Sequence, residues 1–340
     1  MGRRELNILF TCAGRRVALL RAFRSAMSKL GIDGKMIAAD VTSASPAFHK
    51  ADVGLLVPSV RKADYVESLY DHVRTHGVGL LVPLTDLDLP VLAQHREEFA
   101  KAGCTVMVGS PEAIDICRDK VRTSQIVGEA GLAQIRTLPL RDFLSTPFYP
   151  CFVKPTNGSA SVGTRKIESE KELWTHVGAF GADLIVQEYV PGQEFTIDVY
   201  RSRDGQVRCL VPRQRLSVRS GEVVKGLTVR DQSLIDAAAA LAGALGDLWG
   251  VFCCQCRRSS NDAPRFFEIN PRFGGGAPLS IAAGCDLPLY LLQEVLGMPV
   301  TASLGEFADG LLMLRYEEAV FVPYEGDRSS LPGYDTPESR

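Results

Sequence analysis

The sequence is short of the features that mark several large classes of protein. Only 2 of its 340 residues are Trp and 5 are His, and 38 Lys and Arg nearly balance 40 Asp and Glu. The resulting net charge of −2 gives no strong field that would favour nucleic acid or an anionic membrane. No apolar run approaches the roughly 20 residues that span a bilayer. We therefore expect a soluble protein with no nucleic-acid or membrane partner.

The cysteines do not follow the pattern of a secreted, disulfide-stabilised domain. Nine is an odd number over so long a chain, and several of these residues stand in apolar runs. Cys253, Cys254 and Cys256 lack the Cys-x-x-Cys spacing of a zinc site, and no His follows nearby. The first 30 residues are interrupted by Arg and lack a signal-peptide core. Buried thiols in a reducing cytoplasm are therefore predicted.

Residues 1 to about 110 alternate strand patterns with helical ones. Apolar runs without clean alternation at 6–12, 36–40 and 79–83 are typical of buried parallel strands. The segments 17–30 and 87–103 carry apolar residues at helical spacing. This alternation predicts an α/β fold with a doubly wound, mostly parallel sheet.

The pattern changes after Ser110, which is expected to cap a helix over 111–131. Short strands are predicted beyond it, several of them joined by Gly- and Pro-containing turns. They lie at 151–154, 164–166, 184–189, 194–201, 207–212, 251–255 and 266–269. We therefore expect a second, α+β domain.

The most informative segment runs from Phe266 to Gly276. Glu268 and Asn270 stand two apart on a strand, so both side chains point to the same face. Such oxygen donors suit Mg²⁺, and Arg272 follows with a fork of donors that fits a phosphoryl or carboxylate group. A solvated strand end is the alternative for this pair taken alone. Gln255, which interrupts an apolar run, is either a further metal ligand or a structural hydrogen-bonding residue.

Two further segments favour nucleotide binding. Lys154 ends a strand and is followed by a loop of small residues up to Gly163, whose backbone N–H groups can surround phosphate oxygens. The loop is not a Walker A sequence, and an exposed hairpin Lys is the alternative. Farther along, Val190 begins a Val-Pro-Gly turn that exposes backbone amides, and Glu194 is placed to accept hydrogen bonds from hydroxyl groups.

In this order and at these separations, the three segments resemble the ATP-grasp superfamily, most closely its carbamoyl-phosphate-synthase-like members. The resemblance covers residues 1 to about 300. It implies a pre-ATP-grasp α/β domain at 1–110 and a two-lobed ATP-grasp α+β domain at 111–325. The small lobe would span 111–186 and the large lobe 187–325, and a flexible tail would follow at 326–340.

The resemblance also implies the residues of the site. ATP and two Mg²⁺ or Mn²⁺ ions would be bound, with Arg272 stabilising the transferred phosphoryl group as the catalytic residue. The metal ligands would be Gln255, Glu268 and Asn270. The nucleotide contacts would be Lys120, Lys154, Gly158, Ser159, Ser161, Gln187, Glu188, Val190 and Glu194. In this set the two Lys would contact phosphates, 187–190 would form the adenine hinge and Glu194 would hold the ribose. Many members have an acid where this chain has Gln255, so one metal site is expected to be weaker.

The function implied is that of an ATP-dependent ligase acting on a small-molecule carboxylate and an amine. The sequence leaves the formation of a homodimer open. A nicotinamide-dependent oxidoreductase is the first alternative, with Asp40 as the ribose-binding acid, but Gly-x-Gly-x-x-Gly is missing. A non-catalytic ATP-binding sensor is the second. The basic residues Arg213, Arg215 and Arg219 are either a solvated strand face or a contact for phosphate or an acidic substrate.

Overall fold

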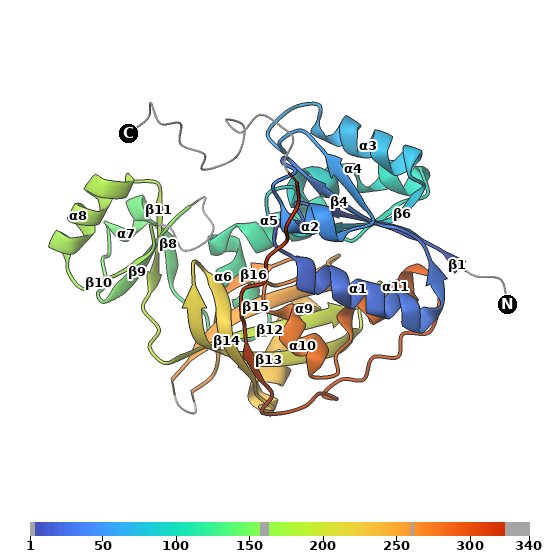
Figure 1. Cartoon of the computed structure of the whole chain (residues 1–340). Coiled ribbons are helices and arrows are strands. Elements are labelled where there is room, and N and C mark those ends of the chain that lie inside the picture. Colours follow the sequence, from blue (N-terminus) through green and yellow to red (C-terminus); the bar gives the residue numbers. More distant parts are fainter. Residues whose placement is uncertain (1–3, 157–162, 260–261, 324–340) are drawn as a thin grey trace. The chain divides into compact units, whose positions relative to one another are not determined.

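The computed structural model describes residues 4–156, 163–259 and 262–323. The chain forms two compact units. One contains the described residues up to Val106 together with the segment from Tyr316 on, and the other is Met107–Arg315. The two units are described separately below (Figure 1).

The first unit is built on a parallel sheet in the strand order β5-β4-β2-β6-β7. Its strands are β2 (Asn7–Thr11), β4 (Met36–Asp40), β5 (Val53–Leu56), β6 (Val78–Pro83) and β7 (Thr105–Val106). A separate parallel pair joins β1 (Arg4–Glu5) to β3 (Ile32–Asp33). The central strand β2 is apolar and fully buried at Ile8, Leu9 and Phe10, as a strand covered on both faces must be.

Helices cover both faces of this sheet, which confirms the predicted doubly wound fold. In Figure 1, α1 (Val17–Leu30) and α2 (Pro46–Lys50) lie on one face, and α3 (Tyr65–Thr75) and α4 (Leu89–Lys101) lie on the other. Gly31 ends α1 in the left-handed conformation, with a φ of 61°.

A buried carboxyl group lies where β2 and β6 end. Asp88 precedes α4, yet its side chain is fully buried and turns inward. Its Oδ2 accepts hydrogen bonds from the hydroxyls of Thr11 and Tyr65, at 2.5 and 3.0 Å. Burial raises the pKa of Asp88 to about 6, because the charged form loses its hydration. Asp88 is therefore part of the core of this unit.

The second unit contains two antiparallel sheets. The smaller has the order β10-β9-β11-β8, with β8 (Thr137–Pro139), β9 (Cys151–Pro155), β10 (Arg165–Ile167) and β11 (Leu184–Glu188). The helices α7 (Leu140–Phe143) and α8 (Glu170–Phe180) accompany it. Phe143, Val153, Leu173 and Val186 are buried together and form its core. The antiparallel pairing of β9 with β10 agrees with the strands predicted at 151–154 and 164–166.

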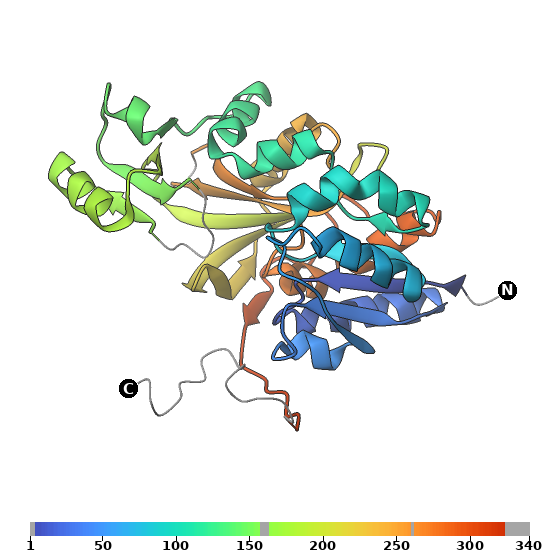
Figure 2. The same cartoon turned by 90° about the horizontal axis from the view of Figure 1, so that it is seen from above.

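The larger sheet has the order β16-β15-β12-β13-β14-β17 and lies beside the smaller one within the same unit (Figures 1 and 2). Its strands are β12 (Gln193–Arg201), β13 (Val207–Arg219), β14 (Glu222–Thr228), β15 (Gly250–Arg258), β16 (Arg265–Asn270) and β17 (Leu312–Leu314). The remaining helices of this half of the unit are α9 (Gln232–Ala244), α10 (Ala277–Ala282) and α11 (Leu287–Val295). A parallel α/β unit followed by antiparallel lobes is the predicted fold class, which is thereby confirmed.

The single helix predicted over 111–131 is wrong in one respect. The segment forms two helices, α5 (Pro111–Arg118) and α6 (Lys120–Glu129). Asp119 separates them because its backbone is extended, with φ −87° and ψ 114°. Its carboxylate accepts hydrogen bonds from the N–H groups of Val121 and Arg122 and so caps α6. The break makes Lys120 the first residue of a helix.

Two further expectations concern the whole chain. Across the described ranges, no helix combines the length and apolar character that a membrane crossing requires. All nine cysteines are free thiols, and only Cys12 is not buried, which confirms the expectation of buried thiols. The described residues end at 323, before the predicted flexible tail begins.

Candidate nucleotide and metal site

The register of the larger sheet gathers polar side chains on one face. Residues directly opposite each other in an antiparallel pair point to the same side. One row of such partners crosses four strands, from Glu268 through Gln255 and Thr196 to Arg213. The next row on this face joins Asn270, Cys253 and Asp198. The three predicted metal ligands therefore share one face of the sheet.

The donor set on this face fits a hard divalent cation. Gln255 and Glu268 are directly opposite each other, which places their Cβ atoms about 5 Å apart. Asn270 lies one row farther along β16 and is buried. Within the described ranges, no cluster of three or more His, Cys, Asp or Glu forms a complete metal cage. The three oxygen donors suit Mg²⁺, which usually completes its shell with water and phosphate oxygens.

The guanidinium of Arg272 lies beside the predicted metal ligands. Its Nη2 donates to Asn270 Oδ1 at 3.1 Å, and its Nη1 donates to the carbonyl oxygen of Phe273 at 3.2 Å. The backbone N–H of Arg272 also donates to the carbonyl of Asn270 at 2.8 Å. This turn holds a fixed positive charge at the end of β16, beside the predicted metal ligand Asn270.

Lys154 extends from the smaller sheet to this polar face. Its ammonium lies 4.5 Å from the centre of the Phe267 ring. The pKa of Lys154 is lowered to about 8, chiefly by desolvation and also by the positive charges of Lys120 and Arg257. The negative charge of Glu268 opposes this shift. The structure thus brings Lys154 and Lys120 close to Glu268, which is more than 100 residues away in the sequence, in a region where positive charges repel one another.

Lys120 also lines a hollow of about 610 Å³ beside α5 and α6. The same hollow is lined by Thr156, the last described residue before the predicted phosphate loop. Gly158, Ser159 and Ser161 of that loop lie outside the described residues. The cationic residues Arg118, Arg122 and Arg141 also line the hollow.

The predicted adenine hinge follows β11. The side chain of Gln187 is buried and donates to Thr137 Oγ1 at 3.0 Å, so it is bonded to the neighbouring strand β8 of the smaller sheet. Glu188 forms a two-point ion pair with Arg265 at 2.7 Å, which lowers the pKa of Glu188. Val190 is buried. A nucleotide at this hinge would therefore meet backbone groups, as the resemblance implies.

Glu194, the predicted ribose contact, lies in a network of charges. Its Oε1 is 2.9 Å from Nε of Arg215 in an ion pair, and Nη2 of Arg215 donates to the Gly221 carbonyl at 2.9 Å. Arg257 is the partner of Glu194 across β12 and β15. Sequence reasoning did not assign Arg257 or Arg265 to the site, because neither belongs to a motif.

The basic stretch of β13 is divided by its register. Arg213 is 1% exposed and Arg215 is 9% exposed, whereas Arg219 is exposed. A solvated face is therefore wrong for Arg213 and Arg215, which lie on the polar face of the sheet. The prediction of a solvated face is correct for Arg219, which is the last residue of β13 and is exposed.

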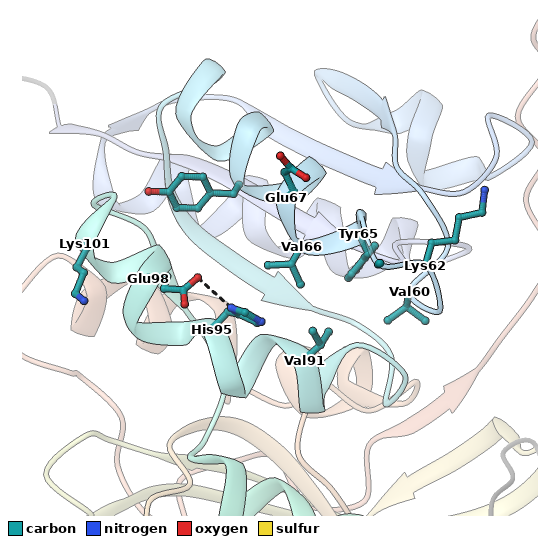
Figure 3. Close-up of a pocket in the computed structure, with 11 residues that line it drawn as sticks. Val60, Lys62, Tyr65, Val66, Glu67, Val91, His95, Glu98 and Lys101 are labelled. Atoms are coloured by element: carbon teal, nitrogen blue, oxygen red, sulfur yellow. Dashed lines mark hydrogen bonds and ion pairs between the residues drawn. The ribbon is translucent and has the colours of Figure 1, made fainter.

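A second hollow, of about 570 Å³, lies between α3 and α4 in the first unit (Figure 3). Tyr65, Val66 and Val91 form part of its wall, and His95 is paired with Glu98 at 3.0 Å. The residues that line it include none of the predicted site residues that the structure describes. The candidate site is therefore the polar face of the second unit.

The parallel α/β unit, the two antiparallel sheets and the convergent Lys and oxygen ligands define the class of two-lobed ATP-binding proteins. Three family models match different parts of the chain, and two of the matches overlap. "PylC-like, N-terminal domain" matches residues 8–107, "D-ala D-ala ligase C-terminus" matches 127–219, and "ATP-grasp in the biosynthetic pathway with Ter operon" matches 181–319. The chain belongs to the ATP-grasp superfamily and has the features of an ATP-grasp ligase-like enzyme.

Known proteins resemble the chain to different extents. D-alanine–D-alanine ligase B of Pseudomonas putida is 28% identical over 159 residues, which cover 40% of this chain and 49% of that protein. The chain thus spans about half of this curated relative. The structure of an L-amino acid ligase from Bacillus licheniformis has a TM-score of 0.70 at 18% identity, covering 91% of this chain and 78% of that one.

A further similar structure is the biotin carboxylase domain of 2-oxoglutarate carboxylase from Hydrogenobacter thermophilus. It was solved as a dimer with MgADP, ADP and bicarbonate. Its TM-score is 0.70 at 18% identity, and the match covers 90% of this chain and 73% of that one. At these identities the two solved structures establish the shared fold.

Proposed function

We propose that the protein is an ATP-dependent ligase that joins a small-molecule carboxylate to an amine. The observation that carries the proposal is the approach of Lys154 from one sheet to Glu268 on the other. The Lys154 ammonium lies beside a set of hard oxygen donors, which supports the proposal. The family model of the D-alanine–D-alanine ligase C-terminus over residues 127–219 supports ligase chemistry.

In the proposed reaction, an oxygen of the substrate carboxylate attacks the γ-phosphorus of ATP. The bond from that phosphorus to the bridging oxygen of ADP breaks, and an acyl phosphate forms. The amine nitrogen then attacks the activated carbonyl carbon and loses a proton, and inorganic phosphate leaves. Lys154 and Lys120 bind the phosphates, and Arg272 stabilises the negative charge on the transferred group.

Gln255, Glu268 and Asn270 would hold Mg²⁺, which compensates the charge of the phosphates when it is bound. Glu194 would orient the ribose, and the backbone at Glu188 and Val190 would meet the adenine. No Ser, Cys or Lys nucleophile is required for this chemistry, because the substrate carboxylate itself attacks ATP.

The test is a screen for phosphate and ADP release, in which carboxylates and amines are combined in pairs with Mg²⁺ and ATP. D-Alanine is one arm of the screen because of the similarity to D-alanine–D-alanine ligases. Release that requires both substrates, together with a product mass equal to their sum minus water, supports the proposal. Glu268→Gln serves as the matched inactive variant.

Titration calorimetry with ATP and NADH, run beside the screen, distinguishes the alternatives. ATP binding with no release for any pair would favour a sensor, and binding of NADH in place of ATP would favour an oxidoreductase. The second outcome is disfavoured by Asp40, whose Oδ2 accepts a hydrogen bond from the Gly14 N–H at 3.0 Å. This carboxylate holds the turn after β2.

We also propose a cytoplasmic location, which is consistent with the free cysteines. Sedimentation of the purified protein tests whether it forms a homodimer.

A further inference from the structure

A buried ion pair lies on the same face of the larger sheet as the predicted metal ligands. Arg213 on β13 and Asp198 on β12 are 1% and 0% exposed. Arg213 Nε donates to Asp198 Oδ2 at 2.7 Å, and its Nη2 donates to Oδ1 at 2.9 Å. Ser280 in α10 also donates to Asp198 Oδ2. Two consecutive strands and a helix about 80 residues farther along the chain therefore meet at one carboxylate.

The loop between β16 and α10 lies on this ion pair. It contains Arg272 and begins directly after Asn270, and its far end is held by the bond from Ser280 to Asp198. A Cβ atom added to Gly274 would lie 3.3 Å from Asp198 Oδ1. One added to Gly276 would lie 2.2 Å from Arg213 Nη1 and 2.7 Å from Val223 Cγ1, and both distances are too short for a real contact. The two glycines thus allow the backbone to approach the ion pair.

Arg213 is incompletely bonded for so deeply buried a charge. Its Nη1 has no hydrogen-bond partner among the described residues, although it is buried. A buried ion pair of this kind contributes little to stability compared with apolar residues of similar volume. The loop backbone at Gly276 is what this atom faces. The contact between Arg213 and the backbone at Gly276 therefore determines where the loop lies more than it stabilises the sheet.

We propose that Arg213 is a positioning residue for the loop 271–276, and through it for Arg272. The guanidinium, held in place by Asp198, sets the height of the loop above the sheet. This height determines where the guanidinium of Arg272 lies relative to Asn270, whose Oδ1 accepts a hydrogen bond from Arg272 at 3.1 Å. The inference rests on the proposed function, since it assigns Asn270 to the metal and Arg272 to the phosphoryl group.

The test measures the Mg²⁺ concentration that gives half of the ATP-induced rise in melting temperature. Gly276→Ala inserts a methyl group between the loop and Arg213, so we expect this concentration to rise at least tenfold. ATP affinity without Mg²⁺ should change less than twofold, because Lys154 and Lys120 belong to β9 and α6 and not to the loop. Gly243→Ala is the matched control, since a Cβ there would meet nothing within 4 Å.

A second variant tests the contact itself. Arg213→Lys removes Nη1, so the double variant Gly276→Ala with Arg213→Lys should need less Mg²⁺ than Gly276→Ala alone. A loop that is merely packed on a structural residue predicts a lower melting temperature without ATP and an unchanged Mg²⁺ requirement, and that result would overturn the inference. If Arg213→Lys does not fold, Gly276→Ala measured against Gly243→Ala decides the question alone.

The two proposals fail in different ways. A wild-type protein whose melting temperature does not respond to Mg²⁺ and ATP would contradict the proposed function and, with it, this inference. A normal wild-type response, with Gly276→Ala indistinguishable from Gly243→Ala, would contradict this inference only.

Discussion

Lys154 should take up a proton when ATP binds. Its pKa is lowered to about 8, because the ammonium is desolvated and other cations lie nearby. A triphosphate placed beside it would favour the charged form and return the pKa toward the ordinary value of 10.5. Between pH 7 and pH 9, ATP binding should therefore be coupled to protonation of this side chain.

The size of the effect follows from the lowered pKa. With a pKa of about 8, roughly one tenth of the free protein has a neutral Lys154 at pH 7, and about nine tenths at pH 9. Proton uptake per bound ATP should rise from about 0.1 to about 0.9 over this range, and the affinity should fall about tenfold. The sign follows because the bound state holds more protons than the free state. ATP itself contributes little, since its terminal phosphate ionises near pH 6.

Titration calorimetry in two buffers with different ionisation enthalpies measures this uptake directly at pH 7, 8 and 9. Lys154→Arg is the control, because a guanidinium stays charged throughout. It should bind ATP with an affinity that is nearly independent of pH and with little proton uptake. Uptake close to zero at pH 9 in the wild type would refute the reasoning, because Lys154 would then be charged before ATP arrives or would not contact it.

Three further predictions address other parts of the molecule. Glu268→Gln should keep its melting temperature without ligand and lose most of the rise produced by Mg²⁺ and ATP, as thermal scans would show, whereas a lowered temperature with the full rise would contradict the metal assignment. The pKa of Asp88 is raised to about 6 in the folded protein. Ionisation of this carboxyl as the pH rises from 4 to 7 should therefore lower the free energy of unfolding by up to about 3 kcal/mol. Urea unfolding should therefore show Asp88→Asn gaining stability relative to the wild type between pH 5 and pH 8; an equal difference at both pH values would contradict this. Asp119→Ala removes the cap of α6 and should lower the free energy of unfolding by about 1 kcal/mol, while Asp115→Ala, on the preceding helix, should not reproduce that loss.

Much of the fold was predictable from local pattern. Uninterrupted apolar runs such as 79–83 indicate strands covered on both faces, and their alternation with helical segments leads to a doubly wound sheet. Glu268 and Asn270 were placed on one face by the two-residue period of a strand alone. These inferences succeed because backbone geometry fixes the direction of neighbouring side chains.

Other features depended on which segments meet in space. The sequence left Arg213 open between a solvated face and a ligand contact, and only the register of β13 against β12 placed it in the interior beside Asp198. The ion pair of Glu188 with Arg265 joins two different sheets across 77 residues. The break at Asp119 was hidden because a helical period continues on both sides of it.

The physical reason is the range of the forces involved. Periodicity and turn residues act over a few neighbours, so the sequence by itself determined the strands, most of the helices and the pair of oxygen donors on β16. Burial, charge pairing and the lowered pKa of Lys154 arise from groups that the chain brings together over long separations. Only the tertiary structure decided which cations surround the candidate site and which glycines the ion pair of Arg213 and Asp198 requires.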